Sequence, residues 1–220
     1  MRALVLLSGG MDSVAALHWA LWRECYNEVR ALFVGYGQPA HDAEFLAAHR
    51  ETDDANVRLT VLDIGEAVRG ILPIAGPVQG CDGGGVSRAN LPARNAILLS
   101  IAAAEAARLW PGGDAALVIG CTRDDGARFP DCQGAALDAA TKALRESLRG
   151  IMRIHVTAPW RSYTKALILL WCELQPPSVL RSVLRSSSCY LGTACGTCDA
   201  CVERRNALIA RSYCLETGTP

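Results

Sequence analysis

The chain has 220 residues, of which 50% are hydrophobic, and its 22 basic and 22 acidic side chains give a formal net charge of +0. This size is sufficient for one sizeable hydrophobic core with a small appendage. Because the balanced charge provides no basic surface for wrapping a duplex, we expect no direct nucleic-acid partner.

The apolar segments of the chain are short. The run at residues 3–7 is too short for the core of a signal peptide, and the runs at residues 96–104 and 166–172 fall far below the length of a membrane span. We therefore expect a cytoplasmic protein with no membrane partner. In that reducing compartment, its 10 cysteines are expected to be metal ligands or buried thiols and not disulfides.

Strand-like and helix-like patterns alternate along the chain. Short apolar runs predict strands at residues 3–7, 31–34, 57–62, 115–119 and 151–156. Apolar residues at helical spacing predict a helix from residue 12 onward and further helices at residues 43–50, 93–110, 135–148 and 163–174. This order indicates an α/β fold, a Rossmann-like parallel sheet with helices on both faces, which binds ligands at the carboxyl ends of its strands.

Two segments interrupt the alternation. Residues 65–92 are rich in glycine and proline and are long for a connection, which favours a lid or a mobile active-site loop over a merely disordered insertion. A cluster of cysteines follows the serines at residues 186–188. We therefore expect an α/β domain over residues 1–185 and a small metal-binding lobe over residues 186–220.

The first predicted strand leads into a glycine-containing loop and a helix. The loop reads Ser8-Gly9-Gly10-Met11-Asp12-Ser13. Backbone N–H groups and hydroxyls at a helix N-terminus attract phosphate, and no lysine follows the glycines as it does in a Walker A loop. The motif resembles the pyrophosphatase loop (S-G-G-x-D-S) of enzymes that split ATP into adenylate and pyrophosphate. We expect all six residues to bind ATP, with Asp12 holding Mg²⁺ or capping the helix.

Four cysteines close to the C-terminus have the spacing of metal ligands. They are Cys189, Cys195, Cys198 and Cys201. Gly196 permits a tight turn between them, and four thiolates with no open position indicate a closed, structural zinc site. An iron–sulfur cluster, or no metal at all, remains an alternative.

Further polar and aromatic residues stand where catalytic loops are expected, and each is a weak signal alone. They are Tyr36, Gln38, His41, Arg94, Asn95, Asp125, Phe129, Asp131 and Lys165. A surface histidine, a solvated arginine or a lysine at a helix cap would explain individual members of this set.

In their order along the chain, these motifs resemble those of the 7-cyano-7-deazaguanine synthase family. The family pattern runs S-G-G-x-D-S, Y-G-Q, P-x-R-N, Y/F-P-D-C, a late lysine and C…C-G-x-C-x-x-C, and the resemblance spans essentially the whole chain. It implies an ATP-binding fold of the PP-loop superfamily, usually dimeric. It also implies conversion of 7-carboxy-7-deazaguanine and ammonia to the nitrile through an adenylate and then an amide.

The implied reaction assigns roles to the candidate residues. Asp12 is expected to hold Mg²⁺, and Arg94 or Lys165 to clamp the charge that accumulates on the α-phosphate, with Asn95 beside them. The base is expected to meet an aromatic wall and a carboxylate that accepts from its exocyclic N–H groups. The candidates for this base site are Tyr36, Gln38, His41, Asp125, Phe129 and Asp131.

The sequence departs from the family at residues 123–133. The family motif there commonly reads E-T-D-F-S-G-Y-P-D-C-R, whereas this chain introduces Arg123 and Arg128. We expect the segment to set the substrate and the nitrogen acceptor. One alternative is therefore a relative from antiviral defence that attaches the deazaguanine to a protein amine. Two others, a tRNA-thiolating enzyme and a non-catalytic zinc module, fit the neutral charge and the intact loop less well.

Overall fold

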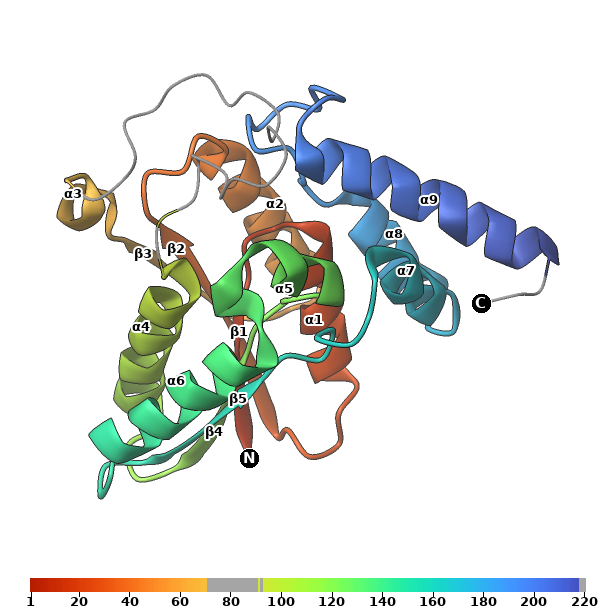
Figure 1. The fold of residues 1–220 in the computed structure, drawn as a ribbon. Coiled ribbons are helices and arrows are strands. Elements are labelled where there is room, and N and C mark those ends of the chain that lie inside the picture. The colour runs from red at the N-terminus through yellow and green to blue at the C-terminus, as the bar shows by residue number, and fades with distance from the viewer. Residues whose placement is uncertain (71–90, 92, 218–220) are drawn as a thin grey trace.

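A single parallel sheet forms the centre of the molecule in the computed structural model, which describes residues 1–70, 91 and 93–217 (Figure 1). The strand order is β3-β2-β1-β4-β5, and every neighbouring pair runs parallel. The strands are β1 (Arg2–Leu6), β2 (Glu28–Gly35), β3 (Leu59–Asp63), β4 (Asp114–Val118) and β5 (Arg153–Thr157). The predicted α/β fold with a parallel sheet is confirmed.

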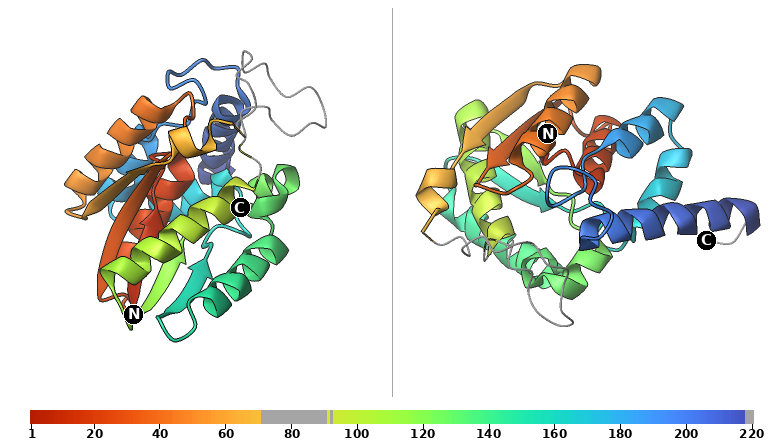
Figure 2. Two further views of the ribbon diagram at one scale, coloured as in Figure 1. Left: turned by 90° about the vertical axis from the view of Figure 1, so that its left-hand side faces the viewer. Right: turned by 90° about the horizontal axis from the view of Figure 1, so that it is seen from above.

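Helices cover both faces of this sheet (Figure 2). They are α1 (Met11–Leu21), α2 (His41–Asp54), α3 (Gly65–Val68), α4 (Arg94–Leu109), α5 (Arg123–Arg128), a 3-10 turn (Pro130–Cys132), α6 (Gly134–Ser147), α7 (Lys165–Glu173), α8 (Pro177–Arg185) and α9 (Asp199–Thr217). Helices α1, α2, α7 and α8 contribute to the core on one face, and α4 and α6 to the core on the other.

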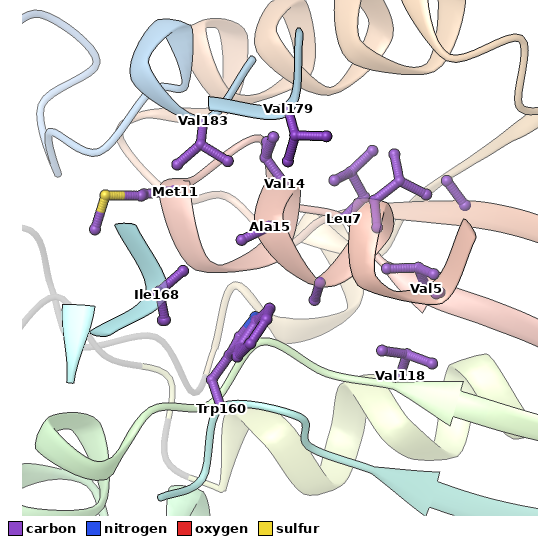
Figure 3. Close-up of a cluster of buried hydrophobic side chains, with 14 of the residues drawn as sticks. Val5, Leu7, Met11, Val14, Ala15, Val118, Trp160, Ile168, Val179 and Val183 are labelled. Carbon is purple, nitrogen blue, oxygen red and sulfur yellow. The ribbon is translucent and has the colours of Figure 1, made fainter. Parts of the chain in front are cut away.

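The central strand β1 shows why the sheet is buried on both sides. Successive side chains of a strand point to opposite faces. Val5 accordingly packs with Val14 of α1 and Trp160 in one core (Figure 3), whereas Leu4 packs with Leu99 of α4 in the other. Because both faces need apolar residues, the strand reads as a continuous apolar run, as parallel strands do.

Besides α3 and the 3-10 turn, three described helices were not predicted as separate elements. Thr122 and Asp125 form a capping box that starts α5 within the segment predicted as a loop. Pro177, which is tolerated at a first helical position, starts α8. The third, α9, begins within the cysteine cluster and includes Cys201. The proposed lid at residues 65–92 includes α3, but most of it lies outside the described residues.

The C-terminal helix α9 lies beside α7 in both views (Figures 1 and 2), and Ala207 of α9 joins the same buried core as α1. The division into two domains at residue 185 stays a prediction. No helix in the described ranges has an apolar stretch long enough to cross a membrane.

Candidate active site

A cavity of about 250 Å³ opens at the carboxyl ends of the central strands β1, β2 and β4. This is the edge at which parallel α/β sheets bind ligands. Most of the predicted site residues line it: Ser8, Gly10, Met11, Asp12, Ser13, Tyr36, Gln38, Arg94, Asn95, Asp125, Phe129 and Lys165. The fold therefore gathers residues that are far apart in the sequence around one space.

The loop between β1 and α1 is held in shape by its own hydrogen bonds. The Ser13 hydroxyl donates to the carbonyl of Gly10 at 2.9 Å and lies 3.1 Å from the Ser8 hydroxyl. Gly9 has a φ of +77°, and a Cβ there would lie 2.4 Å from the carbonyl oxygen of Glu44 on α2. Only glycine fits this close approach, which keeps the loop against α2.

Asp12 and Lys165 form the buried charged centre of the cavity. Lys165 Nζ lies 2.6 Å from Asp12 Oδ2, and Thr164 caps the helix that carries the lysine by accepting from the N–H of Leu167. Burial raises the pKa of Asp12 above its usual range, and Lys165 opposes that rise. Burial would lower the pKa of Lys165, but its carboxylate neighbours, Asp12 foremost, raise it, so the lysine remains charged.

One carboxylate oxygen of Asp12 makes no hydrogen bond in this arrangement. Within the described part of the chain, Asp12 Oδ1 is buried and has no hydrogen-bond partner. An unpaired buried carboxylate oxygen is costly, and oxygen is the ligand that Mg²⁺ prefers. Asp12 therefore fits the metal-holding role that the sequence predicts for it.

Arg94 and Asn95 begin α4 at the opposite side of the cavity. Burial would lower the pKa of Arg94, but its neighbours, the hydrogen-bonded Tyr36 hydroxyl first among them, raise it. Asn95 donates to the thiol of Cys132 at 3.1 Å, and its backbone N–H donates to Asp131 Oδ2 at 2.9 Å. Asp131 is not among the residues that line the cavity. It holds the start of α4.

Gln38 links the end of β2 to helix α2. Its amide oxygen accepts from the backbone N–H of Tyr36 at 2.8 Å, and its amide nitrogen donates to Glu44 at 3.0 Å. Glu44 also lines the cavity, and burial raises its pKa. His41 does not line the cavity, and its ring packs edge-on against Phe33. Of the six residues of the predicted ATP loop, Gly9 is the one that does not line the cavity; it packs against α2 on the opposite side of the loop.

The segment at residues 123–133 enters the cavity through Asp125, Phe129 and Cys132. Asp125 Oδ2 is occupied by the capping box with Thr122, and Asp125 Oδ1 lies 3.8 Å from Lys165. Neither of the two arginines that depart from the family motif lines the cavity. Arg123 is 63% exposed beside Asp124, and Arg128 pairs with Glu203 of α9. The expectation that the segment sets the substrate and the nitrogen acceptor stays a prediction, and in this arrangement it would act through residues other than these two arginines.

Two residues of α9 were missed by the sequence reasoning. Glu203 and Arg204 both line the cavity, and Glu203 Oε2 lies 3.5 Å from Lys165. Burial raises the pKa of Glu203, while Lys165 and Arg128 oppose that rise. Arg204 donates to the hydroxyls of Ser186 and Ser188. The sequence feature that could have identified them is their position directly after Cys201, the last cysteine of the cluster.

The four clustered cysteines lie together, with sulfur atoms all within 4.8 Å of one another. Two of the sulfur pairs, Cys195 with Cys201 and Cys189 with Cys198, are 4.0 Å apart. Tetrahedral zinc with bonds of about 2.3 Å places its sulfurs about 3.8 Å apart. Hydrogen bonds, first that from the Cys198 backbone, lower the pKa of the Cys195 thiol to about 6. The cluster can therefore hold a metal ion.

The segment before the cluster contacts the glycine loop directly. The backbone N–H of Ser187 donates to the carbonyl of Gly9 at 2.9 Å. Three of the four cysteines lie between this contact and α9 in the sequence, and Cys201 lies in the first turn of α9, the helix that carries Glu203 and Arg204.

Comparisons with known proteins identify the family of the chain. The model of the family described as "Queuosine biosynthesis protein QueC" matches residues 2–212. The chain is 36% identical over 218 residues to the 7-cyano-7-deazaguanine synthase of Aromatoleum aromaticum, covering 93% of this chain and 91% of the relative. It is 34% identical over 213 residues to that of Chromobacterium violaceum, covering 92% and 87%.

Among solved structures, the chain is similar to the NH3-dependent NAD synthetase from Campylobacter jejuni, with 17% identity, a TM-score of 0.39 and coverage of 84% and 83%. The family match over nearly the whole chain and the identities above 30% decide the assignment. The chain belongs to the QueC family of queuosine biosynthesis proteins and is an ATP-dependent ligase.

Proposed function

We propose that the chain adenylates the carboxylate of 7-carboxy-7-deazaguanine with ATP and transfers the acyl group to ammonia. The products are the amide and then the nitrile, 7-cyano-7-deazaguanine. The observation that carries the proposal is the buried pair of Asp12 and Lys165 beside the glycine loop, with Asp12 Oδ1 left without a partner. A phosphate loop with an unused carboxylate oxygen suits a nucleotide that arrives with its metal ion.

The ATP half of the reaction uses the loop and the lysine. The N-terminus of α1 receives the phosphates that leave as pyrophosphate, because its N–H groups point toward that space. Asp12 would hold Mg²⁺, which offsets phosphate charge when it is bound. The ammonium group of Lys165 then leaves its ion pair with Asp12, pairs with the α-phosphate and stabilises the negative charge that accumulates there.

The base half uses the apolar and aromatic lining. Phe129 and Leu98 line the cavity together with Tyr36 and Gln38, and provide surface for a planar ring. Arg94 is buried and charged, so it can pair with the carboxylate of the substrate before activation. Replacing the anionic oxygen of that carboxylate by AMP creates the leaving group that ammonia displaces.

A structural zinc ion is part of the proposal. The four thiolates leave no open position for water, which is typical of structural and not catalytic zinc. We assign it to Cys189, Cys195, Cys198 and Cys201, where it fixes the start of α9 beside the active site.

Product analysis tests the proposal. Purified protein is given ATP, Mg²⁺, ammonia and 7-carboxy-7-deazaguanine, and mass spectrometry follows the base. Amide followed by nitrile, with AMP formed in step, supports the proposal, whereas formation of ADP or an unmodified base contradicts it.

The departure from the family motif at residues 123–133 favours a second candidate for the nitrogen acceptor, a protein amine. A parallel reaction with an amine-bearing peptide in place of ammonia separates the two, because only the second acceptor yields a deazaguanine–peptide amide.

A further inference from the structure

Glu203 is a carboxylate in the cavity that the ATP chemistry proposed above does not use. Its side chain is 17% exposed. Glu203 Oε2 lies 3.5 Å from Lys165 Nζ on α7, and Glu203 Oε1 forms an ion pair with Arg128 on α5. Glu203 therefore connects three helices at the side of the cavity that holds the phosphate loop.

Among the ion pairs that Lys165 and Glu203 make, carboxylates outnumber cations. Lys165 faces three carboxylates, those of Asp12, Asp125 and Glu203. Arg128 offsets one of them from the outer side. A largely buried cluster with an excess of carboxylates is costly unless positive charge or N–H donors arrive to pair with it. Mg²⁺ at Asp12 supplies one such partner.

Binding of ATP in the way proposed above would free one oxygen of Glu203. The phosphates attract Lys165 away from the carboxylates, as the proposed reaction requires. Glu203 Oε1 remains fixed by Arg128, which approaches from outside the cavity lining. Glu203 Oε2 then faces the cavity as a fixed hydrogen-bond acceptor beside the place where the acyl phosphate forms.

We propose that Glu203 binds the incoming nitrogen nucleophile by accepting hydrogen bonds from its N–H groups, with Arg128 as a positioning residue that keeps the carboxylate turned toward the cavity. The inference rests on the proposed function. The nitrogen forms a bond to the carboxyl carbon while the bond from that carbon to the oxygen of AMP breaks. The electron pair of that bond leaves with AMP, and the surplus protons of the nucleophile pass to water.

The test separates the two halves of the reaction. Pyrophosphate exchange without ammonia measures adenylation, and amide formation at increasing ammonium concentration gives the KM for the nucleophile. For Glu203→Gln we expect that KM to rise about tenfold or more, because a hydrogen bond to a charged group is lost. Exchange and the affinity for the carboxylate base should stay at parental values. Arg128→Leu should raise the same KM with less effect on kcat.

Glu173→Gln is the matched control. Glu173 of α7 also pairs with an arginine of α9, since Arg211 Nε donates to it at 2.7 Å, but neither residue lines the cavity. We expect no change in either half-reaction. Glu203→Asp keeps the charge with a shorter reach and should give an intermediate KM, so the inference stays testable if Glu203→Gln folds poorly.

Each outcome has one meaning. Absence of exchange in the parental protein refutes the proposed function itself. Normal exchange with an unchanged KM for ammonium in Glu203→Gln refutes the role of Glu203. If Glu203→Gln changes only the Mg²⁺ dependence or only the affinity for the base, the role of Glu203 is also refuted, because its carboxylate would then bind the metal ion or the ring of the base.

Discussion

Replacing Gly9 by alanine tests whether the geometry of the phosphate loop depends on glycine. Gly9 has a φ of +77°, and an added Cβ would lie 2.4 Å from the carbonyl oxygen of Glu44 and 2.9 Å from Ala47 Cβ. The left-handed conformation costs a side-chain-bearing residue about 1 to 2 kcal/mol. Forcing the methyl group against the backbone of α2 adds about 1 to 3 kcal/mol, because the overpacked atoms must shift.

We therefore expect Gly9→Ala to lower the free energy of unfolding by about 2 to 5 kcal/mol, measured by urea denaturation. Gly112→Ala is the control, since Gly112 has a φ of +74° but nothing within 4 Å of an added Cβ. Gly112→Ala should therefore lower the free energy of unfolding only by the cost of the left-handed conformation, about 1 to 2 kcal/mol. Equal losses in the two variants would refute the close approach of the loop to α2.

Three further predictions concern the site. Asp12→Ala should abolish AMP formation while calorimetry still detects binding of the carboxylate base, and persistent AMP production would argue against its role at the phosphates. Cys198→Ala should lower the zinc content found by elemental analysis from about one ion per chain, and an unchanged content would remove the cluster as the zinc site. Arg123→Glu should leave the KM for the base unchanged because the side chain is 63% exposed, and a large increase would place it in contact with substrate.

The sequence was most informative where the fold itself dictates position. The loop from Ser8 to Ser13 follows an apolar strand and precedes a helix, and parallel α/β topology alone brings such a loop to the ligand-binding edge. Lys165 lies at the same edge for a related reason, since it starts a helix after the last strand. In both cases the local pattern and the topology predict the same location.

Other features depended on tertiary contacts that no local pattern shows. Asp131 was expected at the base, but it accepts a hydrogen bond from the backbone N–H of Asn95 and so holds the N-terminus of α4. No local pattern shows this contact, because the two residues are 36 positions apart in the sequence. Arg128 lies in the segment that was expected to set the substrate, but it pairs with Glu203 on α9. The contact of Arg128 was not expected, because the sequence reasoning did not predict the helix that carries Glu203.

The central claim is that the substrate carboxylate attacks the α-phosphate of ATP. It is tested most directly by labelling that carboxylate with heavy oxygen and analysing the nucleotide product by mass spectrometry after a single turnover with ammonia. Adenylation predicts that one labelled oxygen appears in AMP, because the bond from carbon to the bridging oxygen breaks when the nitrogen attacks. Label in inorganic phosphate, or AMP without label, would contradict the account.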